Sequence, residues 1–223
     1  MTAQTHSFFD FAGLTARERY KILTGTIVPR PIALVTTVDG EGRVNAAPIS
    51  FFNCMGSDPA TLVLGVARRD NGEESDTGRN IRASGVFTVN TVSRAILEQM
   101  NICAIGFPPG IEEVAHAGLP TVPGDKVPVP RIADAPAAFE CRQTMILSIG
   151  PAREIILGEV LAAHVRADLI DARLHTDQQA LDAVGRMGGA TYAFTNELLG
   201  LETPSLAEWE GLDAARGTQA GNG

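Results

Sequence analysis

Runs rich in apolar and β-branched residues, some alternating with polar ones, dominate the pattern of this chain. Residues of this kind at a two-residue period are typical of half-buried β-strands. Turn-forming residues at 39–42 and 150–151 join neighbouring runs, so two pairs of them are expected to form hairpins. The last two runs are long enough for the wall of a barrel. The expected strands are 31–38, 44–52, 61–66, 86–92, 139–149 and 153–165.

Helices are predicted between these strands by capping residues and by a helical period. Thr15 and Glu18 form a capping box before a helix that runs to Leu23, and Gly25 is expected to end it. The other expected helices start at Asp76 or Thr77 and end before Gly85, span 94–101 with Ile96, Leu97 and Met100 on one face, begin at Asp177, and span 206–212.

A segment from 103 to 136 is rich in proline and glycine and shows little periodicity. A loop of this length inside a compact domain is usually functional, so we expect a lid or a binding loop. His116 lies in it and is expected at the surface, whereas His164 is expected to make a structural hydrogen bond on a strand. Residues 186–192 are expected to form a glycine turn.

The stretch Asn45–Asn53 is small and polar at first and aromatic at its end. Small side chains let a flat ligand approach the backbone, and polar ones offer it donors and acceptors. The alternative is a strand that kinks at proline and buries its two phenylalanines, and the residues alone favour that alternative. The candidate residues are Asn45, Ala46, Ala47, Pro48, Ser50, Phe51 and Phe52.

The helix expected after Ser75 offers a second candidate site, because a helix N-terminus presents free N–H groups to an anion. Arg79, Arg68 and Arg69 are the cations nearest in sequence. An ordinary capped surface helix is the alternative, and the residues alone favour it. Arg30, between two prolines that enforce extended backbone, is placed at the mouth of the first strand.

Composition excludes several classes of protein. A net charge of −8 opposes general binding to nucleic acid or to anionic membranes. Cys54, Cys103 and Cys141 are odd in number and widely spaced, which supports neither a disulfide framework nor a metal site. We expect three buried, reduced thiols in a cytoplasmic protein. The chain shows no export signal, no run of about 18 apolar residues and no Rossmann glycine motif.

Several fragments taken together resemble the flavin reductase-like, FMN-binding split-barrel family, in the branch of the reductase component of nitrilotriacetate monooxygenase. Their order and spacing carry the resemblance, which runs from about Tyr20 to Tyr192. The fragments are Pro29–Ala33, Asn45–Asn53, Asp76–Ile81, Phe87–Asn90, Ala117–Leu119, Phe139–Cys141, Leu157–Val160 and Gly185–Gly189. We accordingly expect an N-terminal arm at 1–19, one domain at 20–200 and a C-terminal tail at 201–223.

The resemblance implies a mainly β fold, a Greek-key antiparallel split barrel with peripheral helices, working as a homodimer with non-covalent FMN, or FAD, near the subunit interface. In this picture the 45–52 segment lines the isoalloxazine ring, Thr77 and Asn80 lie by the phosphate, and Arg30 reaches the flavin. The family commonly has a lysine where this chain has Ser75. Arg79, Arg68 or Arg69 would then have to supply the positive charge.

The activity that the resemblance implies is hydride transfer from NAD(P)H to flavin, with reduced flavin passed on, in some cases to a monooxygenase partner. Such chemistry belongs to the cofactor, so no catalytic side chain and no metal ligand is named. An oxygenase that retains its flavin and a flavin-binding electron carrier without nicotinamide turnover are the alternatives. A relative of pyridoxamine-phosphate oxidase or of haem-binding barrels is disfavoured, because the matched fragments are those of the reductases.

Overall fold

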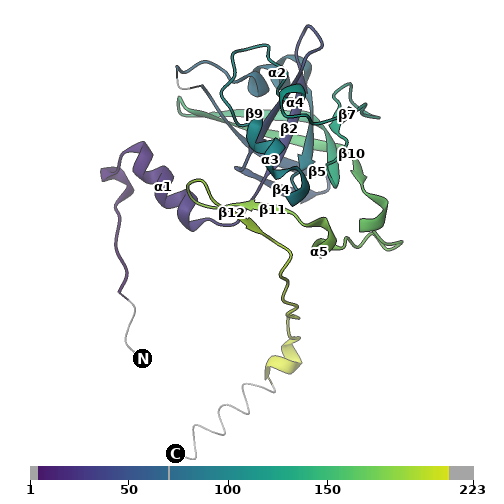
Figure 1. Ribbon diagram of the computed structural model, residues 1–223. Coiled ribbons are helices and arrows are strands. Elements are labelled where there is room, and N and C mark those ends of the chain that lie inside the picture. The colour runs from purple at the N-terminus through teal and green to yellow at the C-terminus, as the bar shows by residue number, and fades with distance from the viewer. Residues whose placement is uncertain (1–4, 70, 211–223) are drawn as a thin grey trace, which may run out of the picture.

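The computed structural model describes residues 5–69 and 71–210, and its main feature is an antiparallel sheet of seven strands (Figure 1). The strands follow the order β3-β2-β6-β9-β10-β5-β4 across the sheet. Their bounds are β2 Ala33–Val38, β3 Val44–Ile49, β4 Phe52–Ser57, β5 Ala60–Ala67, β6 Val86–Thr91, β9 Ala137–Ile149 and β10 Arg153–Val165. The mainly β fold class and the two hairpins expected from the sequence are confirmed.

Shorter elements surround this sheet. In Figure 1, α1 lies outside the barrel beside β11 and β12, and the described C-terminal segment runs away from the barrel. Strands β1 Arg30–Pro31, β11 Val184–Arg186 and β12 Tyr192–Phe194 form one small sheet, and β7 Thr121–Val122 pairs with β8 Arg131–Ile132. The helices are η1 Phe11–Gly13, α1 Ala16–Thr26, α2 Asp76–Ser84, η2 Arg94–Ile96, α3 Leu97–Ile102, α4 Glu113–His116, η3 Ala167–Leu169 and α5 Gln178–Leu181. None of the described helices is long and apolar enough to cross a membrane.

The two edge strands of the large sheet are consecutive in the chain, which closes the sheet into a barrel. Only Ser50 and Phe51 separate β3 from β4. Three virtual Cα bonds span at most about 11 Å, so the two edges must lie close together. The barrel interior holds one apolar cluster around Phe87, Leu64 and Ile156. A second cluster packs the opposite face of β2 against α3 and the 103–136 segment.

The expectation of one continuous strand over 44–52 is wrong. Strand β3 pairs with β2 only as far as Ile49, and the next strand starts at Phe52 and pairs with β5. The chain thus passes from one edge of the sheet, beside β2, to the other edge, beside β5, at Ser50–Phe51. We call this two-residue connection the seam. Phe51 is only partly buried there, rather than placed in the core.

The capping box of α1 is confirmed, but Gly25 does not end the helix. Thr15 accepts the N–H of Glu18, and α1 continues to Thr26. The close approach at this place requires glycine at Gly188 instead, since a Cβ there would come within 3.3 Å of the Gly25 Cα. Nothing lies within 4 Å of a Cβ at Gly25, so the turn between β11 and β12 depends on Gly188 to approach the end of α1.

The cap of α2 also differs from expectation, because Ser75, rather than Asp76 or Thr77, accepts the N–H of Gly78. Gly85 ends α2 with φ of +73°, as expected. The expected helix at 94–101 is divided between η2 and α3, with Ile96 and Met100 buried. Residues 206–210 are helical, and the last two residues of the helix expected at 206–212 lie outside the described residues.

The seam predicts a specific effect of Gly65→Ala on stability. A Cβ at Gly65 would lie 2.8 Å from the Phe51 Cβ, and the Gly65 N–H donates to the Phe51 carbonyl at 2.7 Å. We expect Gly65→Ala to lower the free energy of unfolding by about 1–3 kcal/mol, the usual cost of overpacking. Urea unfolding measures this loss. Gly40→Ala is the control, because nothing lies within 4 Å of a Cβ there. Equal stability of both variants would contradict the packing described at the seam.

Candidate functional site

The free edge of β3 is covered by side chains instead of another strand. Glu112 accepts the N–H of Val44 at 2.9 Å, and Glu113 accepts the N–H of Ala46 at 3.0 Å. Since alternate N–H groups of a strand point the same way, the next one would belong to Pro48, which has none. The edge therefore leaves no outward N–H unpaired from Val44 to Pro48, and its outward carbonyls remain as acceptors.

Glu113 is itself buried, with 8% of the residue exposed. Burial raises the pKa of its carboxyl above the ordinary value of 4.5, and the N–H of Ala46 acts against that rise. Glu113 comes from α4, which lies within the long segment expected to be a binding loop. That segment contains short helices and strands, and α4 holds it against the strand that the sequence marks as a ligand site.

Three of the predicted site residues meet where β3 starts. Asn45, Arg79 and Asn80 line a small pocket there, together with Asp76 and residues of the 39–43 turn and the 110–111 segment. The Asn45 amide donates to the Thr77 hydroxyl at 3.1 Å, and both residues are buried. The structure thus brings Asn45, Thr77, Arg79 and Asn80 together at the beginning of α2.

The arginines near this pocket differ in how far carboxylates already engage them. Arg69 and Arg79 both contact the Asp76 carboxylate. The Nε of Arg69 is buried and has no hydrogen-bond partner. Arg68 instead donates to Glu154 at 2.7 Å. Arg69 and Arg79 share the single carboxylate of Asp76, whereas Arg43 in the pocket lining pairs with Asp39.

The other end of β3 opens into two cavities. Pro48 and Ser50 line one of about 200 Å³ with Tyr20, Asn101 and Tyr192. Ser50 also lines the second, of about 350 Å³, with three further members of the predicted set. These are Arg30, Phe51 and Phe52. Ala46 lies buried in the core against α3, and Ala47 lines none of these cavities.

Arg30 makes its hydrogen bonds to the protein backbone. Its guanidinium donates to the carbonyls of Thr24, Ile27 and Met187 at 2.7–2.9 Å, tying the end of α1 to the β11–β12 turn. The Arg30 Nε is buried without a partner. A role toward a ligand stays a prediction for Arg30.

Residues that the sequence analysis did not assign to the site also line the cavity near Ser50. The Tyr192 hydroxyl donates to the Asn101 side chain at 3.2 Å, and the Arg186 guanidinium lies 4.6 Å from the centre of the Tyr192 ring. The glycine turn expected at 186–192 is confirmed, and Gly189 there has φ of +63°. The sequence signal for Tyr192 was an aromatic residue after a glycine turn. Only the fold shows that Tyr192 shares a cavity with Pro48 and Ser50.

His164 has the structural role expected of it, and His116 is exposed, as expected. The His164 Nε2 lies 2.5 Å from the Glu140 carboxylate, which also accepts the backbone N–H groups of Asp125, Lys126 and Val127. Burial alone would raise the pKa of Glu140, but these hydrogen bonds lower it to about 2. Asp125, Glu140 and His164 lie close enough to bind a metal, yet both Glu140 oxygens are already used in this anchor.

The three thiols differ in exposure. Cys103 and Cys141 are buried as expected, and burial, reinforced by the neighbouring carboxylates Glu113 and Glu140, raises each pKa to about 12. Cys54 is exposed on β4, so the expectation that it is buried is wrong. It lies on β4, which pairs with another strand of the large sheet on one side only, through β5.

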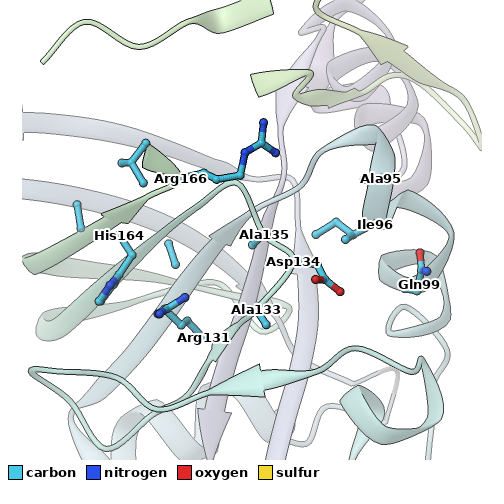
Figure 2. Close-up of a pocket in the computed structure, with 12 residues that line it drawn as sticks. Ala95, Ile96, Gln99, Arg131, Ala133, Asp134, Ala135, His164 and Arg166 are labelled. Carbon is cyan, nitrogen blue, oxygen red and sulfur yellow. The ribbon is translucent and has the colours of Figure 1, made fainter. Parts of the chain in front are cut away.

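A larger cavity, of about 740 Å³, lies elsewhere, between α3, the segment after β8 and the end of β10 (Figure 2). None of the residues predicted for the site lines it. Its lining includes Arg131, Asp134, His164 and Arg166. The predicted site residues therefore gather around β3 and not around this larger cavity.

Comparison with known proteins identifies relatives along most of the chain. The family model of the flavin reductase like domain matches residues 24–184. An uncharacterized protein of Deinococcus radiodurans is 44% identical over 92% of this chain and 93% of its own. The 2-nitrobenzoate 2-nitroreductase NbaA of Pseudomonas fluorescens superposes with a TM-score of 0.83, at 37% identity, over 90% of this chain and 98% of that one. Nitrilotriacetate monooxygenase component B of Bacillus cereus superposes with a TM-score of 0.86, at 30% identity, over 89% of this chain and 100% of that one.

The buried Glu113 predicts a stability difference that depends on pH. Because its pKa is raised in the folded state, its contribution is full at low pH and is lost as the pH rises through the folded-state value, above 4.5. Glu113→Gln cannot ionise, so its free energy of unfolding should increase relative to that of the wild type as the pH rises from 4 toward 7. Urea unfolding at several pH values measures this.

Glu113→Ala is the companion variant, because it removes the acceptor as well as the charge. We expect it to be about 1–3 kcal/mol less stable than Glu113→Gln, the cost of an unpaired buried N–H. A pH-independent gap between Glu113→Gln and the wild type would contradict the raised pKa. Equal stability of the two variants would contradict the hydrogen bond to Ala46.

Proposed function

The chain belongs to the flavin reductase-like family, and on that basis we propose that it binds FMN and reduces it with NAD(P)H. The observation that carries the proposal is the placement of the predicted residues at the two ends of one strand. Asn45, Arg79 and Asn80 gather at the start of β3, and Pro48 and Ser50 line a cavity at its end. Five residue steps of a strand span about 16 Å, which suits a ring, a ribityl chain and a phosphate.

Arg69 and Arg79 are proposed to hold the phosphate in place of the family's usual lysine. The Ser75 hydroxyl is occupied as the cap of α2 and carries no charge. Arg69 and Arg79 share the Asp76 carboxylate, and the buried, unpartnered Arg69 Nε is a donor available to an anion. Arg68 is a poorer candidate because it and Arg82 are balanced by two carboxylates, those of Glu154 and Glu74. Arg69 and Arg79 would offer a phosphate group charge-assisted hydrogen bonds.

The ring end offers acceptors, the Ser50 hydroxyl and the rings of two tyrosines. The outward carbonyls of β3 and the Ser50 side chain are proposed to bind the polar edge of the ring, while Tyr20 and Tyr192 limit the entry of water. Bound flavin supplies the redox chemistry, accepting a hydride from the nicotinamide. Accordingly we assign no side chain as a catalytic acid or base.

We further propose a homodimer whose interface adjoins the seam. Met145, Leu147 and Ile149 point to the outer face of β9 and are 48%, 43% and 56% exposed. Leu147 pairs with Ile155 of β10, and Ile155 pairs with Gly65 of β5, over which the Phe51 of the seam lies. An apolar sheet face of this kind is typical of surfaces that bind another protein, and this one reaches the proposed flavin site.

Light scattering after gel filtration tests the dimer. The wild type should have the mass of two chains, and Leu147→Glu should shift the mass toward one chain by placing a charge in the interface. Leu174→Glu is the matched control, since Leu174 is 77% exposed on a loop outside this face. A wild type with the mass of one chain, or a dimer that Leu147→Glu leaves intact, would contradict the proposed interface.

The reductase activity is tested by adding NADH or NADPH without oxygen to the protein with FMN. We expect the visible flavin bands to bleach faster than those of free FMN, and the faster nucleotide to identify the donor. Ultrafiltration of the reduced sample then shows whether flavin is released, as supply to a monooxygenase partner requires. Bands that persist with both nucleotides would sink the reductase proposal and favour an electron carrier or an oxygenase.

Titration of Thr77→Ala with FMN and with riboflavin separates the phosphate end of the proposed site from the ring end. The variant should lose several-fold more affinity for FMN than for riboflavin, which lacks the phosphate. Equal losses for both ligands would count against a phosphate site at the start of α2.

A further inference from the structure

From the larger cavity we infer a second ligand site, for a small organic acid whose carboxylate or phosphate pairs with Arg131. The cavity of about 740 Å³ lies within the range of small-molecule sites. Its lining comes from α3, from the segment that follows β8 and from the end of β10 (Figure 2). The inference does not depend on the proposed flavin chemistry, because no residue of the proposed flavin site lines this cavity.

Arg131 forms no ion pair and no side-chain hydrogen bond with the residues that the structure describes. It is partly buried, and its Nε is buried without a hydrogen bond. The neighbouring Arg166 is different, since its guanidinium binds both oxygens of Asp168 at 2.7 and 3.0 Å. A guanidinium that is partly desolvated and unpaired favours a ligand with a planar anionic group, which accepts two parallel hydrogen bonds.

The charge around Arg131 is arranged so that an anion fits at one end of the cavity. Figure 2 shows the Arg131 and His164 side chains toward one end and the Asp134 carboxylate directed to the Gln99 side. The Glu140 carboxylate accepts three backbone N–H groups and contacts His164, and it forms no ion pair with Arg131. An anionic group is therefore expected at the Arg131 end, away from Asp134.

The remaining lining of the cavity indicates which chemical group is attached to the anion of the ligand. Five alanines line the cavity, with Ile96 and Val165. Small apolar side chains around one cation leave space for a compact apolar group attached to the anion, such as an aromatic ring. A free inorganic anion would leave that apolar surface exposed to water, so an organic acid fits better.

Calorimetry with benzoate and with phenyl phosphate tests the site, on full-length protein saturated with FMN. We expect at least one of the two to bind, and Arg131→Gln to weaken it by about tenfold or more, as loss of a charge-assisted hydrogen bond implies. Neutral benzamide should bind about tenfold more weakly than benzoate if the carboxylate is the recognised group. The two acids separate a carboxylate from a phosphate as the preferred group.

Two further variants make the result specific to the cavity. Arg17→Gln removes the same charge from an exposed position on α1 and should leave binding unchanged. Ala163→Phe fills the cavity from an exposed position without altering charge and should block binding. Absence of binding by both acids, or binding that survives Arg131→Gln and Ala163→Phe, would overturn the inference. So would competition between benzoate and FMN, whereas FMN affinity unchanged by Arg131→Gln shows that the flavin site is separate.

Discussion

The seam between β3 and β4 is the constraint on which the rest of the structure depends. Two edge strands of a seven-stranded sheet are joined by only Ser50 and Phe51, so the sheet has to curl until its edges meet. The close contact at the seam then requires Gly65, and the Arg153 guanidinium lies 4.3 Å from the centre of the Phe51 ring. Because Ser50 and Phe51 also line a cavity, the connection that closes the barrel also forms part of the candidate site.

The edge of β3 shows how an edge strand can be protected from pairing with another chain. An exposed edge carries unpaired N–H groups that invite pairing with another chain. Here two carboxylates from the 103–136 segment and one proline remove that risk, and the outward carbonyls remain. The same contacts fix the segment in place, so the loop and the strand that it covers stabilise each other. Burial of Glu113 is the cost of this arrangement, and its raised pKa is the sign of that cost.

Charge in this acidic chain is distributed by local pairing. Around α2, Arg68 forms an ion pair with Glu154, while Arg69 and Arg79 compete for the single carboxylate of Asp76. The start of α2 can therefore present positive charge although Ser75 carries none, because two neighbouring arginines share one carboxylate. Arg131 follows the same logic in a different part of the fold, where no carboxylate of the described residues forms an ion pair with it. Net charge alone reveals neither place.

Local pattern was enough for the elements whose cause lies within a few residues. The capping box at Thr15, the left-handed Gly85 and the long 139–165 hairpin all follow from neighbours in sequence, and the ordered motifs identified the family. The cap of α2 is local as well, since Ser75 accepts the N–H of Gly78, one residue before the predicted position. The division of 44–52 at the seam, the exposure of Cys54 and the carboxylates that cover the edge of β3 were decided by tertiary structure. Each depends on a partner distant along the chain, such as β5 for Phe52 or Glu113 for Ala46, and periodicity within one segment carries no information about which distant group will satisfy its hydrogen bonds.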